Sequence, residues 1–334
     1  MSLRSILLTV IRTIGVALAL PLGLVCAGAA LAAQGGRWSA SLDALAHFAP
    51  FWLAGALGVV AAGVVLARGA LRGALVVLGL VGALAAGSLM APEYLRDAGP
   101  HADAKAPLQL KLLQFNVWWF NADVERTADW IAAQNADVIV LEEARASFRD
   151  ALLRRGHYHV SCDGCSVTIL TRAQPVAWGG LPGPWPSPAM TYVTFATAQG
   201  PFTVFGVHLS WPTSNGLQQR QGANLGKVLS TYPRSSLIVS GDFNSTPWSF
   251  TRRRMDRDLG LIRRTRAVFS WPARDVTGQV AKVPFPFLPI DHVYAGREWR
   301  TVSVKRGPRL GSDHYPVIVT LARDPATGRR RPSR

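Results

Sequence analysis

Residues 236–247 read SLIVSGDFNSTP, in which three consecutive apolar residues lead into a glycine and two chemically active side chains. A short apolar run bounded by turn-forming residues is typical of a buried strand. Asp242 and Asn244 follow that strand directly, and strand ends are where layered α/β proteins collect their functional groups. The stretch therefore predicts an α/β fold with a functional site at this end of the strand.

Three other signatures have the same form and occur in a fixed order along the chain. They are Phe115-Asn116, Leu141-Glu142-Glu143 and Ser312-Asp313-His314. Each contributes carboxylate, amide or imidazole groups, and the first two lie at the ends of apolar runs. Each alone has an ordinary explanation, since Asp and Asn favour turns through local hydrogen bonds. Their joint, ordered occurrence predicts one shared site.

The chain from residue 108 to residue 323 is long enough to bury a single core, and its pattern alternates strands and helices. Helices are predicted at residues 123–134 and 144–155, with a third over residues 217–229. Strands are predicted at residues 108–116, 138–141, 166–171, 192–197, 202–208, 236–240, 291–294 and 315–321.

These motifs resemble those of the endonuclease/exonuclease/phosphatase superfamily, the group of DNase I, exonuclease III and the neutral sphingomyelinases. The matching pieces are Phe115-Asn116-Val117, DVIVLEE at residues 137–143, Val207-His208-Leu209, Arg220-Gln221, GDFNSTP at residues 241–247, IDHV at residues 290–293 and GSDH at residues 311–314. The resemblance covers residues 108–323 and nothing before them. It implies an α/β fold, a four-layer α/β sandwich of two packed mixed sheets flanked by helices, and hydrolysis of phosphoester bonds.

The acidic and amide groups predict a metal centre. Oxygen ligands from carboxylates and carboxamides suit Mg²⁺ or Mn²⁺, and such sites keep open positions for water and substrate. Glu143 is the expected ligand, and the resemblance adds Asn116 and Asp313. The family pattern usually has Gln at position 142, so Glu142 adds a negative charge whose orientation the sequence leaves open.

The remaining polar residues are expected to act on the substrate, because phosphoester hydrolysis needs an oriented water and neutralised phosphoryl oxygens. Asp242 is expected to orient and deprotonate the water, and Asn244 to contact the phosphoryl group. The resemblance puts His314 beside the phosphate, oriented by Asp291, and has His208 donate a second hydrogen bond. Whether a histidine or a metal-bound water protonates the leaving group stays open.

The N-terminal third has a different character, which accounts for the high hydrophobic share of 49%. Residues 13–33, 48–67 and 73–91 carry no charge, and each stretch is close to the ~20 apolar residues that cross a bilayer. We expect a membrane region at residues 1–91 with three transmembrane helices, then a proline-containing linker at residues 92–107.

The distribution of arginines predicts the topology of this membrane region. Arg4 and Arg12 flank the first stretch and Arg68 and Arg72 fill the short second loop, so these ends are expected in the cytoplasm. We therefore expect a multi-pass protein of the cell (inner) membrane with its catalytic domain on the extracytoplasmic, periplasmic side. A cleaved signal peptide ending near Ala32 is the alternative for the first stretch, and it leads to the same location.

The cysteine pair in Cys162-Asp163-Gly164-Cys165 has three possible explanations. It is a disulfide, half of a zinc site with His157 and His159, or two free thiols. An extracytoplasmic location favours the disulfide.

The net charge of +16 and the arginines between residues 252 and 266 suggest a nucleic-acid substrate. Arginine outnumbers lysine 31 to 5 along the whole chain, however, so part of the basicity is general composition. Beside a bilayer the same charge would hold anionic lipid headgroups. The apolar loop PFPFLP at residues 284–289 is expected to pack against the sheet, and lining a substrate cleft or reaching the membrane surface are the alternatives.

Three hypotheses for the function follow. The first is a membrane-anchored, metal-dependent phosphodiesterase of the endonuclease type, and the second applies the same chemistry to phospholipids or small phosphorylated headgroups. The third is a non-catalytic binding module, against which the complete set of acidic residues and histidines argues. No obligate protein partner is evident, and the tail at residues 324–334 is expected to be disordered.

Overall fold

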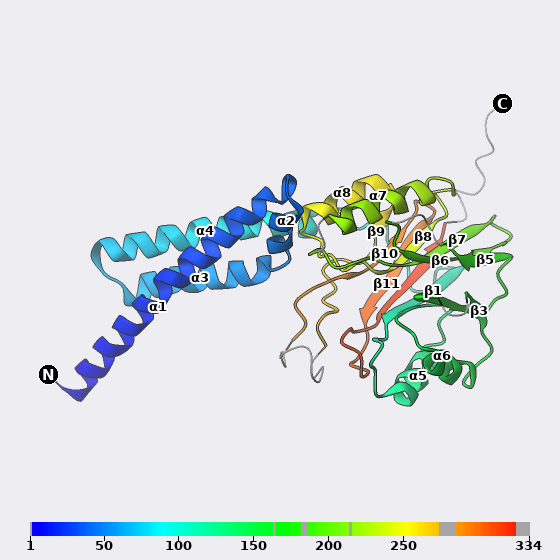
Figure 1. The fold of residues 1–334 in the computed structure, drawn as a ribbon, viewed down its shortest axis with the longest axis horizontal. Helices are drawn as coiled ribbons and strands as arrows, with labels where there is room; N and C mark the ends of the chain where they lie inside the picture. Colours follow the sequence, from blue (N-terminus) through cyan, green and yellow to red (C-terminus); the bar gives the residue numbers. More distant parts are fainter. Residues whose placement is uncertain (1, 163–164, 182–185, 214–215, 274–284, 325–334) are drawn as a thin grey trace, which may run out of the picture. The chain divides into compact units, whose positions relative to one another are not determined.

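The structure is a computed structural model that describes residues 2–162, 165–181, 186–213, 216–273 and 285–324 (Figure 1). The chain divides into two compact units. The first comprises Met1–Arg96 with Pro247–Arg253, and the second comprises Asp97–Thr246 with Arg254–Arg334. Each unit is described by itself below. The predicted tail, apart from Asp324, and the start of the predicted apolar loop lie outside the described residues.

Three long helices dominate the first unit. They are α1 (Leu3–Gln34), α3 (Ala49–Leu66) and α4 (Gly69–Leu95). Each is long and apolar enough to cross a membrane, by length and composition. The short helices η1 (Gly35–Arg37) and α2 (Ala40–Ala46) connect α1 to α3. The prediction of three apolar N-terminal helices is therefore confirmed.

The basic residues near the chain start and in the α3–α4 turn lie at the same end of this helical unit. The guanidinium group of Arg12 donates hydrogen bonds to the carbonyl oxygen of Leu66 at 3.1 and 3.0 Å. Arg72, on the first turn of α4, donates to the carbonyl of Val64 at 2.6 Å. Positive charge is thus concentrated at the end of the unit that contains the α3–α4 turn.

The second unit contains two six-stranded mixed sheets. The first sheet has the order β11-β12-β1-β2-β4-β3 and the second the order β5-β6-β7-β8-β10-β9. The strands of the first sheet are β1 (Gln109–Asn116), β2 (Val138–Glu142), β3 (His159–Ser161), β4 (Val167–Thr171), β11 (Trp299–Arg306) and β12 (Val317–Arg323). Those of the second are β5 (Ala177–Gly180), β6 (Ala189–Phe195), β7 (Phe202–His208), β8 (Ile238–Asp242), β9 (Ile262–Arg263) and β10 (Asp291–Ala295). The pairs β1–β2 and β7–β8 are parallel, and each lies in the middle of its sheet.

Three hydrophobic clusters hold the layers of this unit together. One lies between the sheets, where Val140 and Ile169 of the first sheet belong to the same cluster as Val204 and Val293 of the second. The outer face of the first sheet packs against α5 (Val124–Ala133) and α6 (Ala146–Leu153). The outer face of the second sheet packs against α7 (Leu217–Leu229) and α8 (Phe250–Leu259). The expected four-layer α/β sandwich is therefore confirmed.

Side chains along β1 alternate between the two faces of the first sheet. Leu110 and Leu112 belong to the cluster between the sheets, whereas Leu113 and Phe115 belong to the cluster under the helices. Successive side chains of a strand point to opposite faces, so Asn116 points the same way as Leu112. Inward-facing positions therefore change from apolar to polar at the end of the strand.

The structure also contains elements that the sequence patterns did not predict. β3 and β9 have three and two residues, too few to establish a period. In β11 a register shift between Thr301 and Ser303 breaks the alternation. α8 contains four arginines and two aspartates in its ten residues FTRRRMDRDL, which conceal the apolar spacing of a helix. Each miss has a local cause and leaves the fold class unchanged.

We predict that Gly206→Ala destabilises the sandwich. A methyl group at position 206 of β7 would lie 2.7 Å from Val167 Cγ1 and 2.8 Å from Val140 Cγ1 in the facing sheet. Overpacking of this kind costs about 1–3 kcal/mol. Gly226→Ala in α7 is the control, because its methyl group would meet nothing within 4 Å, and it is expected to stabilise the helix slightly. Thermal unfolding of the full chain in detergent tests both, and equal melting temperatures for Gly206→Ala and wild type would contradict the packing described.

Candidate active site

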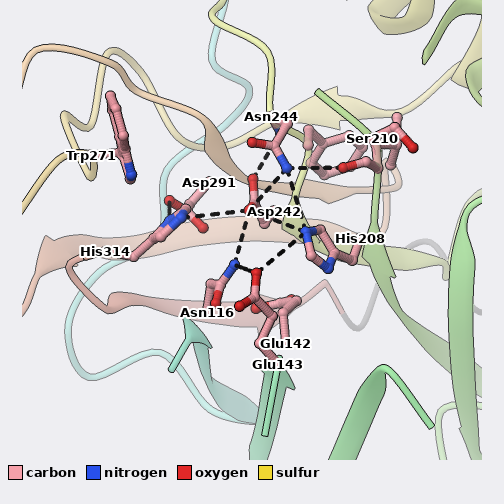
Figure 2. Close-up of polar contacts among 12 residues, drawn as sticks. Asn116, Glu142, Glu143, His208, Ser210, Asp242, Asn244, Trp271, Asp291 and His314 are labelled. Atoms are coloured by element: carbon pink, nitrogen blue, oxygen red, sulfur yellow. Dashed lines mark hydrogen bonds and ion pairs between the residues drawn. The ribbon is translucent and has the colours of Figure 1, made fainter. Parts of the chain in front are cut away.

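Polar side chains from both sheets meet at one end of the sandwich, between the sheets (Figure 2). In the first sheet, Asn116 of β1 pairs in register with Glu142 of β2. In the second sheet, Asp242 of β8 pairs with His208 of β7 on one side and with Asp291 of β10 on the other. All five positions face inward, because each lies an even number of residues from an inward-facing apolar residue of its own strand.

Asp242 is the centre of this group, and its carboxylate is only 1% exposed. Its Oδ2 accepts a hydrogen bond from the Asn116 amide at 3.1 Å, across the gap between the sheets. Its Oδ1 accepts one from the backbone N–H of Asn244 at 2.8 Å. The Asn116 amide also donates to Glu143 Oε1 at 3.0 Å, so one amide links the two carboxylates (Figure 2).

Two histidines flank Asp242. The Nδ1 of His314 lies 2.9 Å from Asp291 Oδ2, and its Nε2 lies 3.6 Å from Asp242 Oδ2. The Nε2 of His208 also lies 3.6 Å from Asp242 Oδ2, and 4.0 Å from Glu143 Oε1. The His314 side chain is 4% exposed and that of His208 is 21% exposed. His314 is thus fixed by a buried carboxylate, whereas His208 and Glu143 border solvent.

The backbone around the site is held in unusual conformations. Glu143 and Asn244 have positive φ angles of 57° and 47°, in the left-handed region that residues other than glycine seldom adopt. The Gln218 amide donates to the carbonyl oxygens of Phe243 and Asn244 at 3.0 Å each and so secures the second turn. The first is secured by the backbone N–H of Trp119, which donates to Glu143 Oε2 at 3.1 Å. Strain of this kind clusters at functional sites.

The concentration of carboxylates in a dry site shifts several pKa values. Burial raises the pKa of Asp242 to about 6, although the neighbouring His314 acts in the opposite direction. Burial and the charges of Asp291 and Asp242 raise the pKa of Glu142 well above its usual range. Burial alone would lower the pKa of His314, but the charges of Asp291 and Asp242 outweigh it and raise that pKa well above its usual value. The raised pKa favours the imidazolium form of His314, beside an Asp242 carboxyl whose pKa is raised to about 6.

Gln114 is a member of this layer that sequence reasoning missed. It is fully buried, and its amide donates to Glu142 Oε2 at 2.9 Å and to Asp291 Oδ1 at 2.7 Å, one residue in each sheet. The signal was present, since Gln114 lies between the inward-facing Leu112 and Asn116. Glu142, whose orientation the sequence left open, points inward to Gln114.

The predicted metal ligands are not all joined in one network. Glu143 and Asn116 are hydrogen-bonded to each other. The Oδ2 of Asp313 instead accepts a hydrogen bond from the Trp271 indole at 3.1 Å, and its buried Oδ1 has no hydrogen-bond partner among the described residues. A second grouping able to hold a metal ion consists of Asp242, Asp291 and His314, whose ligand atoms lie within 4.8 Å of one another. A buried carboxylate oxygen without a hydrogen-bond partner is the kind of oxygen donor that a divalent cation takes.

Three of the seven arginines between residues 252 and 266 that suggested nucleic acid are buried, whereas Arg257 and Arg266 are exposed. Arg252, Arg263 and Arg264 are buried, at 0%, 3% and 2% exposure. Arg263 pairs with Asp256 at 2.9 Å, and Arg264 donates to backbone carbonyls that include that of Trp299 at 2.7 Å. These three arginines stabilise the domain and do not form a basic surface.

Cys162 and Cys165 form a disulfide with a Cα–Cα distance of 5.7 Å. This is the favoured of the three explanations for the pair. His157 and His159 are exposed.

Comparison with solved structures supports the fold. A functionally unknown conserved protein from Enterococcus faecalis V583 is 16% identical with a TM-score of 0.53, and the match covers 64% of this chain and 100% of that one. An endonuclease/exonuclease/phosphatase family protein from Bacteroides thetaiotaomicron is 15% identical with a TM-score of 0.50, over 65% and 99% of the two chains. TDP2 from D. rerio, complexed with single strand DNA product, is 15% identical with a TM-score of 0.50, over 64% and 98%. These likenesses show the fold alone.

Sequence comparison identifies the family. No curated protein matches this chain at a significant level. The family sequence profile for endonucleases, exonucleases and phosphatases matches residues 113–314, which span the whole set of strand-end signatures and more than half of the chain. The chain therefore belongs to the endonuclease/exonuclease/phosphatase family.

Proposed function

We propose that this chain is a membrane-anchored, metal-dependent phosphoester hydrolase that acts on phosphodiesters, with residues 108–323 as the catalytic domain. The observation that carries the proposal is the buried Asp242 carboxylate, 3.6 Å from both His208 and His314 and hydrogen-bonded by Asn116. A base with a pKa near the working pH is the most effective, and the pKa of about 6 meets that condition. Asp242 orients the attacking water and accepts its proton.

The neighbouring residues bind the phosphoryl group in this proposal. The His314 imidazolium is fixed by Asp291, so its Nε2–H is available to a phosphoryl oxygen. His208 donates a second hydrogen bond from the more exposed side. The amide of Asn244 donates to the carbonyl oxygen of Leu209 at 2.9 Å and to Asp242 Oδ2 at 3.3 Å, and in this proposal it turns to the phosphoryl group when substrate binds.

Glu143, Asn116 and Asp313 are the proposed ligands of Mg²⁺ or Mn²⁺. The carboxylates of Glu142, Glu143, Asp242 and Asp291 lie close together at this end of the sandwich, beside His208 and His314, which supports a divalent cation there (Figure 2). When bound, the ion supplies positive charge to the phosphoryl oxygens.

Two substrate classes fit this chemistry. A nucleic acid is suggested by the fold likeness to D. rerio TDP2, whose structure is a complex with a single-strand DNA product. A phospholipid or small phosphorylated headgroup is favoured by the three membrane-length helices and by the burial of three of the clustered arginines. Assays with Mg²⁺ on bis-p-nitrophenyl phosphate, single-stranded and plasmid DNA, and lipid vesicles test the proposal. If none of these substrates is hydrolysed, the result would favour a non-catalytic binding module.

Asp242→Asn and His314→Gln are each expected to reduce kcat by at least about 100-fold, the usual contribution of a positioned acid or base. Each new side chain is nearly isosteric with the one it replaces, so both variants are expected to fold. His159→Gln on the exposed strand β3 is the control and is expected to keep full activity. Steady-state turnover of bis-p-nitrophenyl phosphate measures the effect, and wild-type rates in either site variant would refute the assigned roles.

Glu143→Gln is expected to raise the Mg²⁺ concentration needed for half-maximal activity by at least about tenfold, because loss of a ligand charge weakens binding of a hard cation. Calorimetric titration with Mg²⁺ provides a reading that does not depend on turnover. Glu125→Gln on α5, whose carboxylate pairs with Arg154 on the surface, is the matched control. An unchanged Mg²⁺ affinity in Glu143→Gln would remove this residue from the metal centre.

The catalytic domain is proposed to lie on the extracytoplasmic side of the cell membrane. The concentration of arginines at the α3–α4 end of the helical unit supports a cytoplasmic location for that end. We predict that a β-lactamase reporter fused after residue 334 protects a bacterial host from ampicillin, whereas a fusion in the α3–α4 turn at residue 68 does not. Protection by the second fusion alone would reverse the topology.

A further inference from the structure

A cavity of about 460 Å³ opens beside the candidate active site. Its walls come from the residues just before β4, from the end of β5 and from the start of β6. Its lining includes Cys162, Cys165, Ser166, Gly180, Ala189 and Met190. We infer that this cavity, named here the disulfide pocket, binds an apolar ester group of the substrate while the phosphoryl group occupies the catalytic centre. The inference rests on the proposed function and makes it more specific.

Two backbone connections bring the disulfide pocket next to catalytic groups. The backbone N–H of Glu143 donates to the carbonyl of Ser166 at 3.2 Å, so one wall adjoins the proposed metal ligand. Ala189 is the register partner of His208 in the β6–β7 ladder, so the opposite wall adjoins the exposed histidine. His208 Nε2 and Glu143 Oε1 are themselves 4.0 Å apart. A group attached to a phosphorus atom held by these two residues would therefore lie at the pocket entrance.

The lining of the disulfide pocket determines which chemistry it accepts. The described side chains around it are a disulfide, Ala189, Met190, Val167, Leu181 and the hydroxyl of Ser166. No charged side chain is among these described lining residues, so nothing there compensates a second phosphate. Sulfur and thioether groups are polarisable and favour apolar and aromatic partners. The volume is within the range of small-molecule sites and admits an alkyl chain or an aromatic ring.

The disulfide is packed closely into this wall. A methyl group at Gly180 would lie 2.8 Å from both the Cys162 and the Cys165 sulfur atoms. The end of β5 therefore contacts the disulfide directly, and glycine is required for that contact. The covalent link closes the chain immediately before β4, which holds the pocket wall beside Ser166.

The arrangement commits the pocket to one occupant, an alkyl or aryl substituent of the phosphoester itself. Continuity with the catalytic centre supports this, since Ser166 of the pocket is hydrogen-bonded to the Glu143 backbone and Ala189 is paired with His208 on the neighbouring strand. The described lining residues carry no charge, whereas a site for the next phosphate of a nucleic acid would be expected to contain basic side chains. Phospholipids and aryl esters both have such an apolar substituent.

The test compares the binding of methylphosphonate, butylphosphonate and phenylphosphonate to the full chain in detergent with Mg²⁺, measured by calorimetry. These probes share one phosphoryl group and differ only in the substituent. Phenylphosphonate is expected to bind at least about tenfold more tightly than methylphosphonate, as in hydrophobic pockets generally. Equal affinities for the three probes in the wild-type chain would overturn the inference.

Ala189→Leu fills the pocket and is expected to abolish most of the preference for phenylphosphonate over methylphosphonate. Ala177→Leu adds the same volume at an exposed position of β5 and is expected to retain it. A preference that survives in Ala189→Leu would also overturn the inference. The double variant of Cys162→Ser and Cys165→Ser is expected to reduce the preference as well, because it removes the disulfide from the wall.

Turnover of bis-p-nitrophenyl phosphate, measured in parallel, separates this inference from the proposed function. Turnover without any preference among the phosphonates would leave the hydrolase standing and reject the pocket. A preference without turnover of any phosphodiester would keep the pocket and reject the hydrolase. Hydrolysis of single-stranded DNA at the same rate by Ala189→Leu and the wild type, together with no phosphonate preference, would assign a nucleic-acid substrate instead.

Discussion

The two sheets of this domain pack face to face, and helices cover the outer side of each sheet. The strands in the middle of the sandwich are therefore buried on both faces. Most of the buried strand side chains are consequently apolar. Beyond the inward-facing Leu112, Val140 and Ile238, the inward-facing positions at one end become polar, at Gln114 and Asn116 of β1, Glu142 of β2, and Ser240 and Asp242 of β8. The alternation of side chains therefore places acids and amides from two sheets opposite one another, and the candidate site is the polar end of the core.

Burial of several carboxylates in that small space is costly unless they are hydrogen-bonded or compensated. Gln114 supplies hydrogen bonds to the carboxylates of Glu142 and Asp291. The positive charge of the His314 imidazolium compensates the neighbouring Asp291 carboxylate. Burial, together with the charge of Asp291, still raises the pKa of Asp242 to about 6, against the opposing effect of the two histidines. A bound divalent cation would neutralise the excess negative charge of these buried carboxylates.

The sequence predicted the fold class and most elements near the site, because strands such as β7 and β8 are continuous apolar runs that end in recognisable motifs. It also predicted that Asp291 would orient His314, and the two side chains are 2.9 Å apart. Gln114 was missed because a lone glutamine in a strand carries no motif. The arginines at residues 252–266 suggested a basic surface, whereas Arg252, Arg263 and Arg264 are buried. Arg263 pairs with Asp256 of α8, and Arg264 donates to carbonyls at residues 296 and 299, contacts that a local pattern does not reveal.

The sequence by itself determined the three apolar helices, the order of the strand-end signatures and membership of the family, since these depend on composition and on local spacing. Only the tertiary structure decided which groups touch. The bridge from Gln114 to both sheets, the inward orientation of Glu142 and the position of the cysteine pair beside Ser166 and Gly180 all join residues that are distant in the chain or on different strands. Contacts of that kind follow from sheet order and register, which a periodic pattern does not encode because the period is the same for every pairing.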